Sequence, residues 1–123
     1  MDKKKDKILN VGSRDILLRF IEPNFLDDNL CDCYGQWIER KNEIQVQKIL
    51  ESPDLEKTIL HELLHCFVSE SKLGQNILSD EKDEELLVSH METQIYQFFK
   101  NNPEMLIVIF GHLMKRWLNL KKV

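Results

Sequence analysis

Two histidines four residues apart are the residues of this chain best suited to chemistry. They belong to the segment TILHELLHCF at 58–67, in which His61, Glu62 and His65 form an H-E-x-x-H pattern. Side chains four apart on a helix project from the same side, so the two imidazoles could bind one zinc ion. Glu62 would then be the general base that accepts a proton from a metal-activated water. The competing interpretation is an ordinary amphipathic helix that contains two histidines.

A catalytic zinc site needs a third protein ligand, with the last position left for water. The extended metzincin pattern is absent, because it requires a third histidine six residues after the second, where this chain has serine. The next source is the acidic segment EKDEE at 81–85. Glu84 lies four residues before the apolar Val88, at the end of an expected buried stripe, and is our predicted ligand. Glu85 points about 100° away and is the rival, and Asp83 also stays open.

Strand patterns occupy the first half of the chain. The segment Asp15 to Ile21, DILLRFI, is rich in branched apolar residues and precedes a turn at Glu22-Pro23-Asn24. Segments 34–39 and 43–48 flank Arg40-Lys41-Asn42, and in the second of them Ile44 and Val46 alternate with polar neighbours. We therefore predict a strand at 15–21 and a hairpin at 34–48 with one solvent-exposed face.

Helical patterns occupy the second half. A helix from Pro53 to about Ser71, capped by Ser52, is expected to bury one apolar face, made of Leu55, Ile59, Leu63, Cys66 and Phe67. A second helix, capped by Ser79 or Asp80, has an apolar stripe of Val88, Met91, Ile95 and Phe98, and its His90 is expected to be solvated. Pro103 ends it and begins a third helix that runs to about Leu120.

Length and charge restrict the class of protein. The chain has 123 residues, which suits one domain over 1–123, with residues 1–7 as a frayed end. Its net charge of -4 argues against nucleic acid as a partner. No apolar segment follows the first lysines, and the apolar run Met105 to Phe110 is too short to span a membrane. We expect a cytoplasmic protein whose Cys31 and Cys33 are plain thiols and whose Cys66 is a core residue.

The combination of TILHELLHCF with EELLVSHMETQIYQFF and a following NP resembles the small HExxH metallopeptidase-like proteins of bacterial phages and mobile elements. These are similar in pattern to the ImmA/IrrE peptidases and the minigluzincins. The resemblance implies zinc on His61, His65 and Glu84, and Glu62 as base. It also implies an α+β, zincin-like fold, in which a small twisted sheet packs on the HExxH helix beside a glutamate-bearing helix and a C-terminal helix.

In such folds an edge strand binds peptide substrate by strand addition, and 43–48, with Ile44 and Val46, is the expected strand here. The residue that stabilises the oxyanion is not evident, and Tyr96 and His112 are the candidates. The leading hypothesis is a zinc metallo-endopeptidase of the bacterial host cytoplasm that acts on a peptide or protein.

Two other classes of function stay open. One is a zinc-stabilised binding or regulatory module with latent or lost catalysis, and the other is a metal-free interaction protein. The third helix is apolar on more than one face from Met105 to Phe110. It is therefore predicted to be central to the core or to form a homodimer contact.

Overall fold

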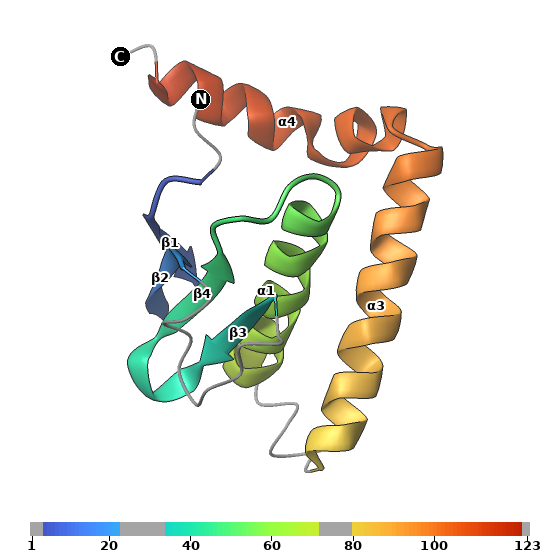
Figure 1. Ribbon diagram of the computed structural model, residues 1–123. Coiled ribbons are helices and arrows are strands. Elements are labelled where there is room, and N and C mark those ends of the chain that lie inside the picture. Colours follow the sequence, from blue (N-terminus) through green and yellow to red (C-terminus); the bar gives the residue numbers. More distant parts are fainter. Residues whose placement is uncertain (1–3, 23–33, 72–79, 122–123) are drawn as a thin grey trace. The chain divides into compact units, whose positions relative to one another are not determined.

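The computed structural model describes residues 4–22, 34–71 and 80–121, and it has the α+β architecture that the sequence predicts. A four-stranded mixed sheet is accompanied by three long helices (Figure 1). The strands are β1 (Lys7–Val11), β2 (Arg14–Ile21), β3 (Gly35–Ile38) and β4 (Glu43–Gln47). The helices are the short 3-10 turn η3 (Glu39–Lys41) and the α-helices α1 (Asp54–Ser71), α3 (Glu81–Asn101) and α4 (Glu104–Lys121). The chain forms two compact units, which divide within α3 after Glu92.

The sheet has the strand order β1-β2-β4-β3. β1 pairs antiparallel with β2, β4 runs parallel to β2, and β3 pairs antiparallel with β4, with Trp37 opposite Ile44. The predicted strand at 15–21 and the hairpin at 34–48 are thereby confirmed. The prediction that 43–48 is an edge strand is wrong, because β4 is paired on both sides. The edge strand of this hairpin is β3.

The core lies between α1 and one face of the sheet, as the ribbon shows (Figure 1). Ile44 and Val46 of β4 point into it and are completely buried, since alternate side chains of a strand face the same side. Their neighbours in this core cluster come from β1, β2, the β4–α1 connection and α1, and are Val11, Ile16, Leu18, Phe20, Leu50, Leu55 and Cys66. The predicted core position of Cys66 is confirmed.

The opposite face of β4 carries polar side chains that are buried. Gln45 is only 1% exposed, and Glu43 and Gln47 are also buried. The Nε2 amide of Gln45 donates to Glu43 at 2.5 Å, and the amide of Gln36 donates to Gln45 at 3.2 Å. The prediction of a solvent-exposed face on this strand is therefore wrong. Gln36, Gln45 and Glu43 thus form a chain of hydrogen bonds, which offsets the cost of burying their polar atoms.

Residues 4–7, predicted to fray, make defined contacts. Lys7 starts β1 and pairs with Leu18, and the backbone N–H of Phe20 donates to Asp6 at 2.8 Å. Lys4 forms an ion pair with Glu51 at 3.1 Å. β1 was not predicted, because its five residues, KILNV, are too few for a clear alternation.

The helix α1 begins after Pro53 and ends at Ser71, as the sequence predicts. The Ser52 hydroxyl, the expected cap, donates to the carboxylate of Glu56 at 2.5 Å. Near the other end of α1, Glu70 accepts hydrogen bonds from the backbone N–H and the hydroxyl of Ser13, both at 2.9 Å, and thus fixes the helix to the β1–β2 turn. The predicted burial of Phe67 is wrong: it is 46% exposed, and Val68 is buried instead.

The helix α3 is capped by Asp80, whose side chain accepts from the N–H of Lys82 at 2.9 Å. In the first unit its buried residue is Val88, while Met91 is 43% exposed, so the predicted apolar stripe is only partly buried. In the second unit, α3 ends at Asn101 and α4 follows, with the rings of Phe99 and Phe110 6.2 Å apart.

Many large apolar side chains of α4 are exposed, from Leu106 to Leu120. Among the described residues, no helix combines the length and the apolarity that a membrane crossing requires. Several residues named above lie outside the described ranges, namely Pro23, Asn24, Cys31, Cys33 and Ser79.

Candidate functional site

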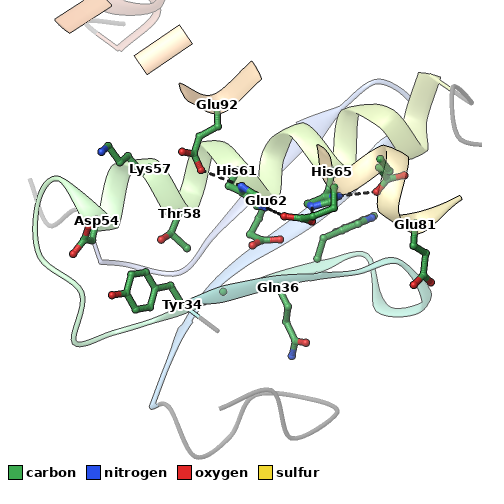
Figure 2. A pocket seen from close by; sticks show the side chains of 14 residues that line it. Tyr34, Gln36, Asp54, Lys57, Thr58, His61, Glu62, His65, Glu81 and Glu92 are labelled. Carbon is green, nitrogen blue, oxygen red and sulfur yellow. Dashed lines mark hydrogen bonds and ion pairs between the residues drawn. The ribbon is translucent and has the colours of Figure 1, made fainter. Parts of the chain in front are cut away.

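The two histidines of the H-E-x-x-H pattern lie on the side of α1 that faces the first turns of α3, whereas Glu62 points toward β3 (Figure 2). His65 contacts Glu84, whereas His61, one turn earlier on α1, contacts Glu92, two turns later on α3. The two helices therefore run antiparallel at this point. Both imidazoles are largely shielded, with side chains that are 19% exposed for His61 and 14% for His65.

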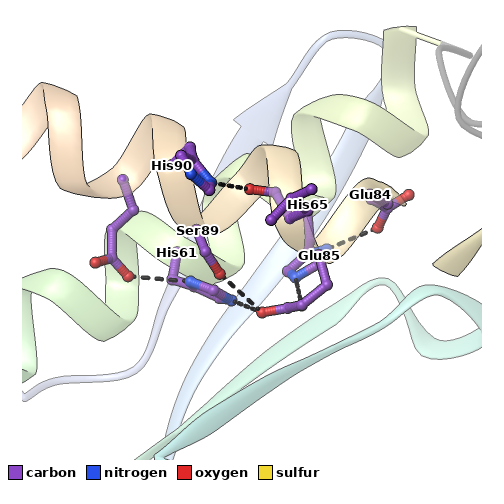
Figure 3. A network of polar contacts seen from close by, with 8 residues as sticks. His61, His65, Glu84, Glu85, Ser89 and His90 are labelled. Atoms are coloured by element: carbon purple, nitrogen blue, oxygen red, sulfur yellow. Dashed lines mark hydrogen bonds and ion pairs between the residues drawn. The ribbon is translucent and has the colours of Figure 1, made fainter. Parts of the chain in front are cut away.

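Both histidines direct their Nε2 atoms to one carboxylate, that of Glu85 (Figure 3). The Nε2 of His61 lies 2.9 Å from one oxygen of Glu85, and the Nε2 of His65 lies 2.8 Å from the other. One ligand atom from each of His61, His65 and Glu85 falls within 4.8 Å of the others. These three residues form the group in the described ranges that could hold a metal ion.

Glu84, the third ligand that we predicted, takes a different place. Its carboxylate lies 2.6 Å from Nδ1 of His65, on the side of the ring opposite Glu85. The prediction assumed that Val88 and Met91 both lie on the buried side of α3, in line with Glu84. In the structure Met91 is exposed. Val88 is buried, and the rival Glu85, three residues before it, is the residue that joins the two Nε2 atoms.

Glu92 is a site residue that the sequence analysis missed. Its carboxylate lies 3.0 Å from Nδ1 of His61, and its side chain is only 20% exposed. Seven residues separate it from Glu85, which is about two helical turns and puts both on one side of α3. The sequence alone shows that Glu85 and Glu92 share a side of α3. It does not show that α1 and its histidines lie against that side.

Glu62 is buried between α1 and β3, with 7% of its surface exposed. Burial raises the pKa of its carboxyl group, and this effect outweighs the opposing influence of His61, His65 and a hydrogen bond from the backbone of Trp37. A carboxylate with a raised pKa holds a proton more readily than one in water.

The environment of His65 contains opposing influences. Burial, the largest of them, lowers the pKa of the imidazole, but the hydrogen bond to Glu84 and the charges of Glu62, Glu85 and Glu84 together raise it above its ordinary value. The negative surroundings thus favour positive charge at this position, whether a proton or a metal ion provides it.

An open cleft of about 860 Å³ contains these groups. It is lined by α1, the first part of α3 and β3, and Tyr34 and Asp54 lie at one end (Figure 2). β3 approaches α1 closely at Gly35, where a Cβ atom would lie 2.8 Å from the Thr58 methyl group. The absence of a side chain at residue 35 therefore allows the edge strand to lie against the helix that carries the histidines.

The other predicted site residues lie elsewhere. Ile44 and Val46 are fully buried on the central strand and cannot contact a substrate. Tyr96 and His112 belong to the second unit and are not among the residues that line the cleft. His90 is exposed, as predicted, with its Nδ1 2.8 Å from the carbonyl oxygen of Leu86.

Asp83, which the sequence left open as a ligand, does not reach the histidines. It lines a separate shallow depression on α3, together with Leu86, Leu87 and His90.

The arrangement of donors fits a metal ion. Two imidazole nitrogens and a carboxylate oxygen are the ligand set of many catalytic zinc sites, and here they meet at the wall of an open cleft. Both Nδ1 atoms already have carboxylate partners, which leaves the Nε2 atoms to face the centre. In comparisons with known proteins, no protein-family profile, no curated protein and no solved structure matches this chain.

Proposed function

We propose that this protein is a zinc-dependent peptidase that hydrolyses peptide bonds in the cleft between α1, α3 and β3. The observation that carries the proposal is the convergence of His61, His65 and Glu85 beside the buried carboxyl group of Glu62. A group that only stabilised the fold through a metal would not require a second, buried carboxylate next to its ligands.

The nature of the donors supports zinc. Imidazole nitrogens together with a carboxylate suit Zn²⁺, whereas Ca²⁺ and Mg²⁺ prefer sites made of oxygen atoms alone. His61, His65 and Glu85 would hold the ion. When bound, it would supply Lewis acidity, which lowers the pKa of water and polarises a substrate carbonyl.

Glu62 is suited to the proton transfers of hydrolysis. Its place next to His61 brings its carboxylate into the same cleft, and the backbone N–H of Trp37 fixes one side of it. It would take a proton from the attacking water and deliver it to the leaving amine. Its raised pKa favours this second role, because a proton that it has accepted is retained until the amine needs it.

The edge strand β3 offers backbone groups to a peptide. In an antiparallel pair of strands, hydrogen-bonded residue pairs alternate with pairs that are not hydrogen-bonded. Tyr34 and Gln47 are a hydrogen-bonded pair, because the N–H of Gln47 donates to the carbonyl of Tyr34, so the next pair, Gly35 and Val46, is not. Gly35 and Trp37 therefore direct their backbone groups away from β4. The N–H of Trp37 bonds to Glu62, which leaves the groups of Gly35 and the carbonyl of Trp37 beside the cleft to pair with an extended peptide.

The test is cleavage of a mixture of unstructured peptides by the zinc-loaded protein, analysed by mass spectrometry. We expect cleavage by the parent protein, and a loss of about 10²- to 10⁴-fold in the Glu62→Gln variant, because an amide cannot accept the proton. Asp83→Asn, on the same helix as Glu85 but outside the cleft, is the control and should cleave normally. Stoichiometric zinc binding without any cleavage would instead support a zinc-stabilised binding module.

A further inference from the structure

The two imidazoles of the site each contact carboxylates through both ring nitrogens, although binding a metal ion would use only one nitrogen of each ring. Each has a carboxylate on Nδ1 as well as the shared carboxylate on Nε2 (Figure 3). Glu84 lies 2.6 Å from Nδ1 of His65, and Glu92 lies 3.0 Å from Nδ1 of His61. Within the part of the chain that the structure describes, the two rings have different carboxylates on the Nδ1 side, so each histidine has a partner of its own.

These partners are more shielded from solvent than the central carboxylate. The side chains of Glu84 and Glu92 are 27% and 20% exposed, whereas that of Glu85 is 54% exposed. An exposed ion pair contributes little, because water competes for both charges. A charged hydrogen bond in a shielded position restrains the two groups more strongly, and the 2.6 Å contact has the short length of such a bond.

A carboxylate on Nδ1 has a defined effect on a histidine. It accepts the proton of Nδ1, which keeps the lone pair of a neutral ring on Nε2, and it fixes the rotation of the ring. Both effects act here on rings whose Nε2 atoms point to the same place. The carboxylates on the outer side of the rings therefore match the requirement of a site that binds through Nε2.

We propose that Glu84 and Glu92 are positioning residues, each assigned to one histidine, that hold the Nε2 atoms of His65 and His61 in the orientation that binds metal. This inference rests on the proposed zinc site. It goes beyond the ligands His61, His65 and Glu85, because it gives Glu84 and Glu92 the role of orienting the two histidines. The shorter contact makes the restraint on His65 the stronger of the two.

The first experiment measures zinc affinity by competition with a chromophoric chelator. Replacement of such a partner typically weakens metal binding by about 10- to 100-fold, and we expect a loss in this range for Glu84→Ala and a smaller one for Glu92→Ala. Glu84→Gln should recover part of the affinity, since its amide oxygen still accepts from Nδ1. Asp83→Asn is the control and should bind as the parent does. Unchanged affinity in both alanine variants would overturn the inference while leaving the zinc site intact.

The second experiment needs no metal. Long-range ¹H–¹⁵N spectra of the histidine side chains in the metal-free protein should show a slowly exchanging Nδ1 proton on both His61 and His65. We expect Glu84→Ala to remove the protection of His65 alone, and Glu92→Ala that of His61 alone. A merely structural role would affect both rings or neither, and either result would contradict the assignment.

The two experiments also separate the two proposals. A parent protein that binds no zinc but shows the selective loss of Nδ1 protons would contradict the zinc site and retain the pairing of carboxylates with histidines. A parent protein that binds zinc but lacks protected Nδ1 protons would support the zinc site and contradict the pairing of carboxylates with histidines.

Discussion

Glu85 and His65 meet across two helices, with an oxygen of the carboxylate 2.8 Å from Nε2 of the imidazole. The other oxygen of the same carboxylate lies 2.9 Å from Nε2 of His61. One glutamate thus bridges the two histidines of the H-E-x-x-H segment, and the site is formed from α1 and α3 together.

This bridge leads to a prediction about zinc affinity. Glu85→Ala should weaken zinc binding by more than the roughly 10- to 100-fold that is typical when an outer partner of a ligand is lost. The physical reason is that it removes a ligand atom rather than a group that orients one. Isothermal titration of the metal-free protein with zinc measures the effect, and Asp83→Ala should bind normally. Equal affinity in Glu85→Ala and the parent would exclude Glu85 as a ligand.

Zinc should also stabilise the fold, because an ion that binds only the folded state adds its binding free energy to folding. At a free zinc concentration of about 100 times the dissociation constant, the gain is about 2.7 kcal/mol. The melting temperature of the parent should rise with zinc and fall again with a chelator, while that of His61→Ala should not respond. A parent protein that melts at the same temperature with and without chelator would contradict the metal site.

Gly35 should be intolerant of a side chain. A Cβ atom there would lie 2.8 Å from both the carbonyl oxygen of Gln45 and the methyl group of Thr58, so β3 would have to move away from α1. We expect Gly35→Ala to lower the free energy of unfolding by about 1–3 kcal/mol, the usual cost of overpacking.

Gly111, inside α4, is the matched control for Gly35. Its added Cβ would approach no closer than 3.5 Å, and alanine is favoured in a helix by about 1 kcal/mol. Denaturant unfolding followed by circular dichroism should therefore show opposite signs for the two variants. A neutral Gly35→Ala would show that the edge strand is not held against the helix.

The exposed apolar residues of α4 keep open the prediction of a homodimer. Leu113 is 57% exposed and lies on the broad apolar side of the helix, whereas His112 is on its polar side. We expect light scattering to give a molar mass near twice the chain mass of 14.7 kDa, because large exposed apolar patches are uncommon on monomers.

Leu113→Glu should shift that mass toward the monomer, because burial of an unpaired charge at an apolar interface is unfavourable. His112→Glu should leave the mass unchanged. A strictly monomeric parent protein at all concentrations would rule out the homodimer.

Features that depend on neighbours along the chain could be predicted from the amino-acid sequence. The alternation in EIQVQ identified β4, Pro53 and Asp80 marked the starts of α1 and α3, and Pro103 separated α3 from α4. The shared side of His61 and His65 also followed directly, because a four-residue spacing is fixed by the geometry of one helix. Short β1 escaped detection because five residues give too little periodicity.

Which elements meet, and how each is rotated about its axis, depends on long-range packing and is visible only in the folded protein. Only the insertion of β4 between β2 and β3 shows that β4 is central and that β3 is an edge strand, and only the packed structure shows that the polar residues of β4 are buried. Likewise, the 100° between Glu84 and Glu85 could be read from the sequence, but the direction from which α1 approaches could not. The tertiary arrangement places Glu85 at both Nε2 atoms and leaves Glu84 and Glu92 at the Nδ1 atoms.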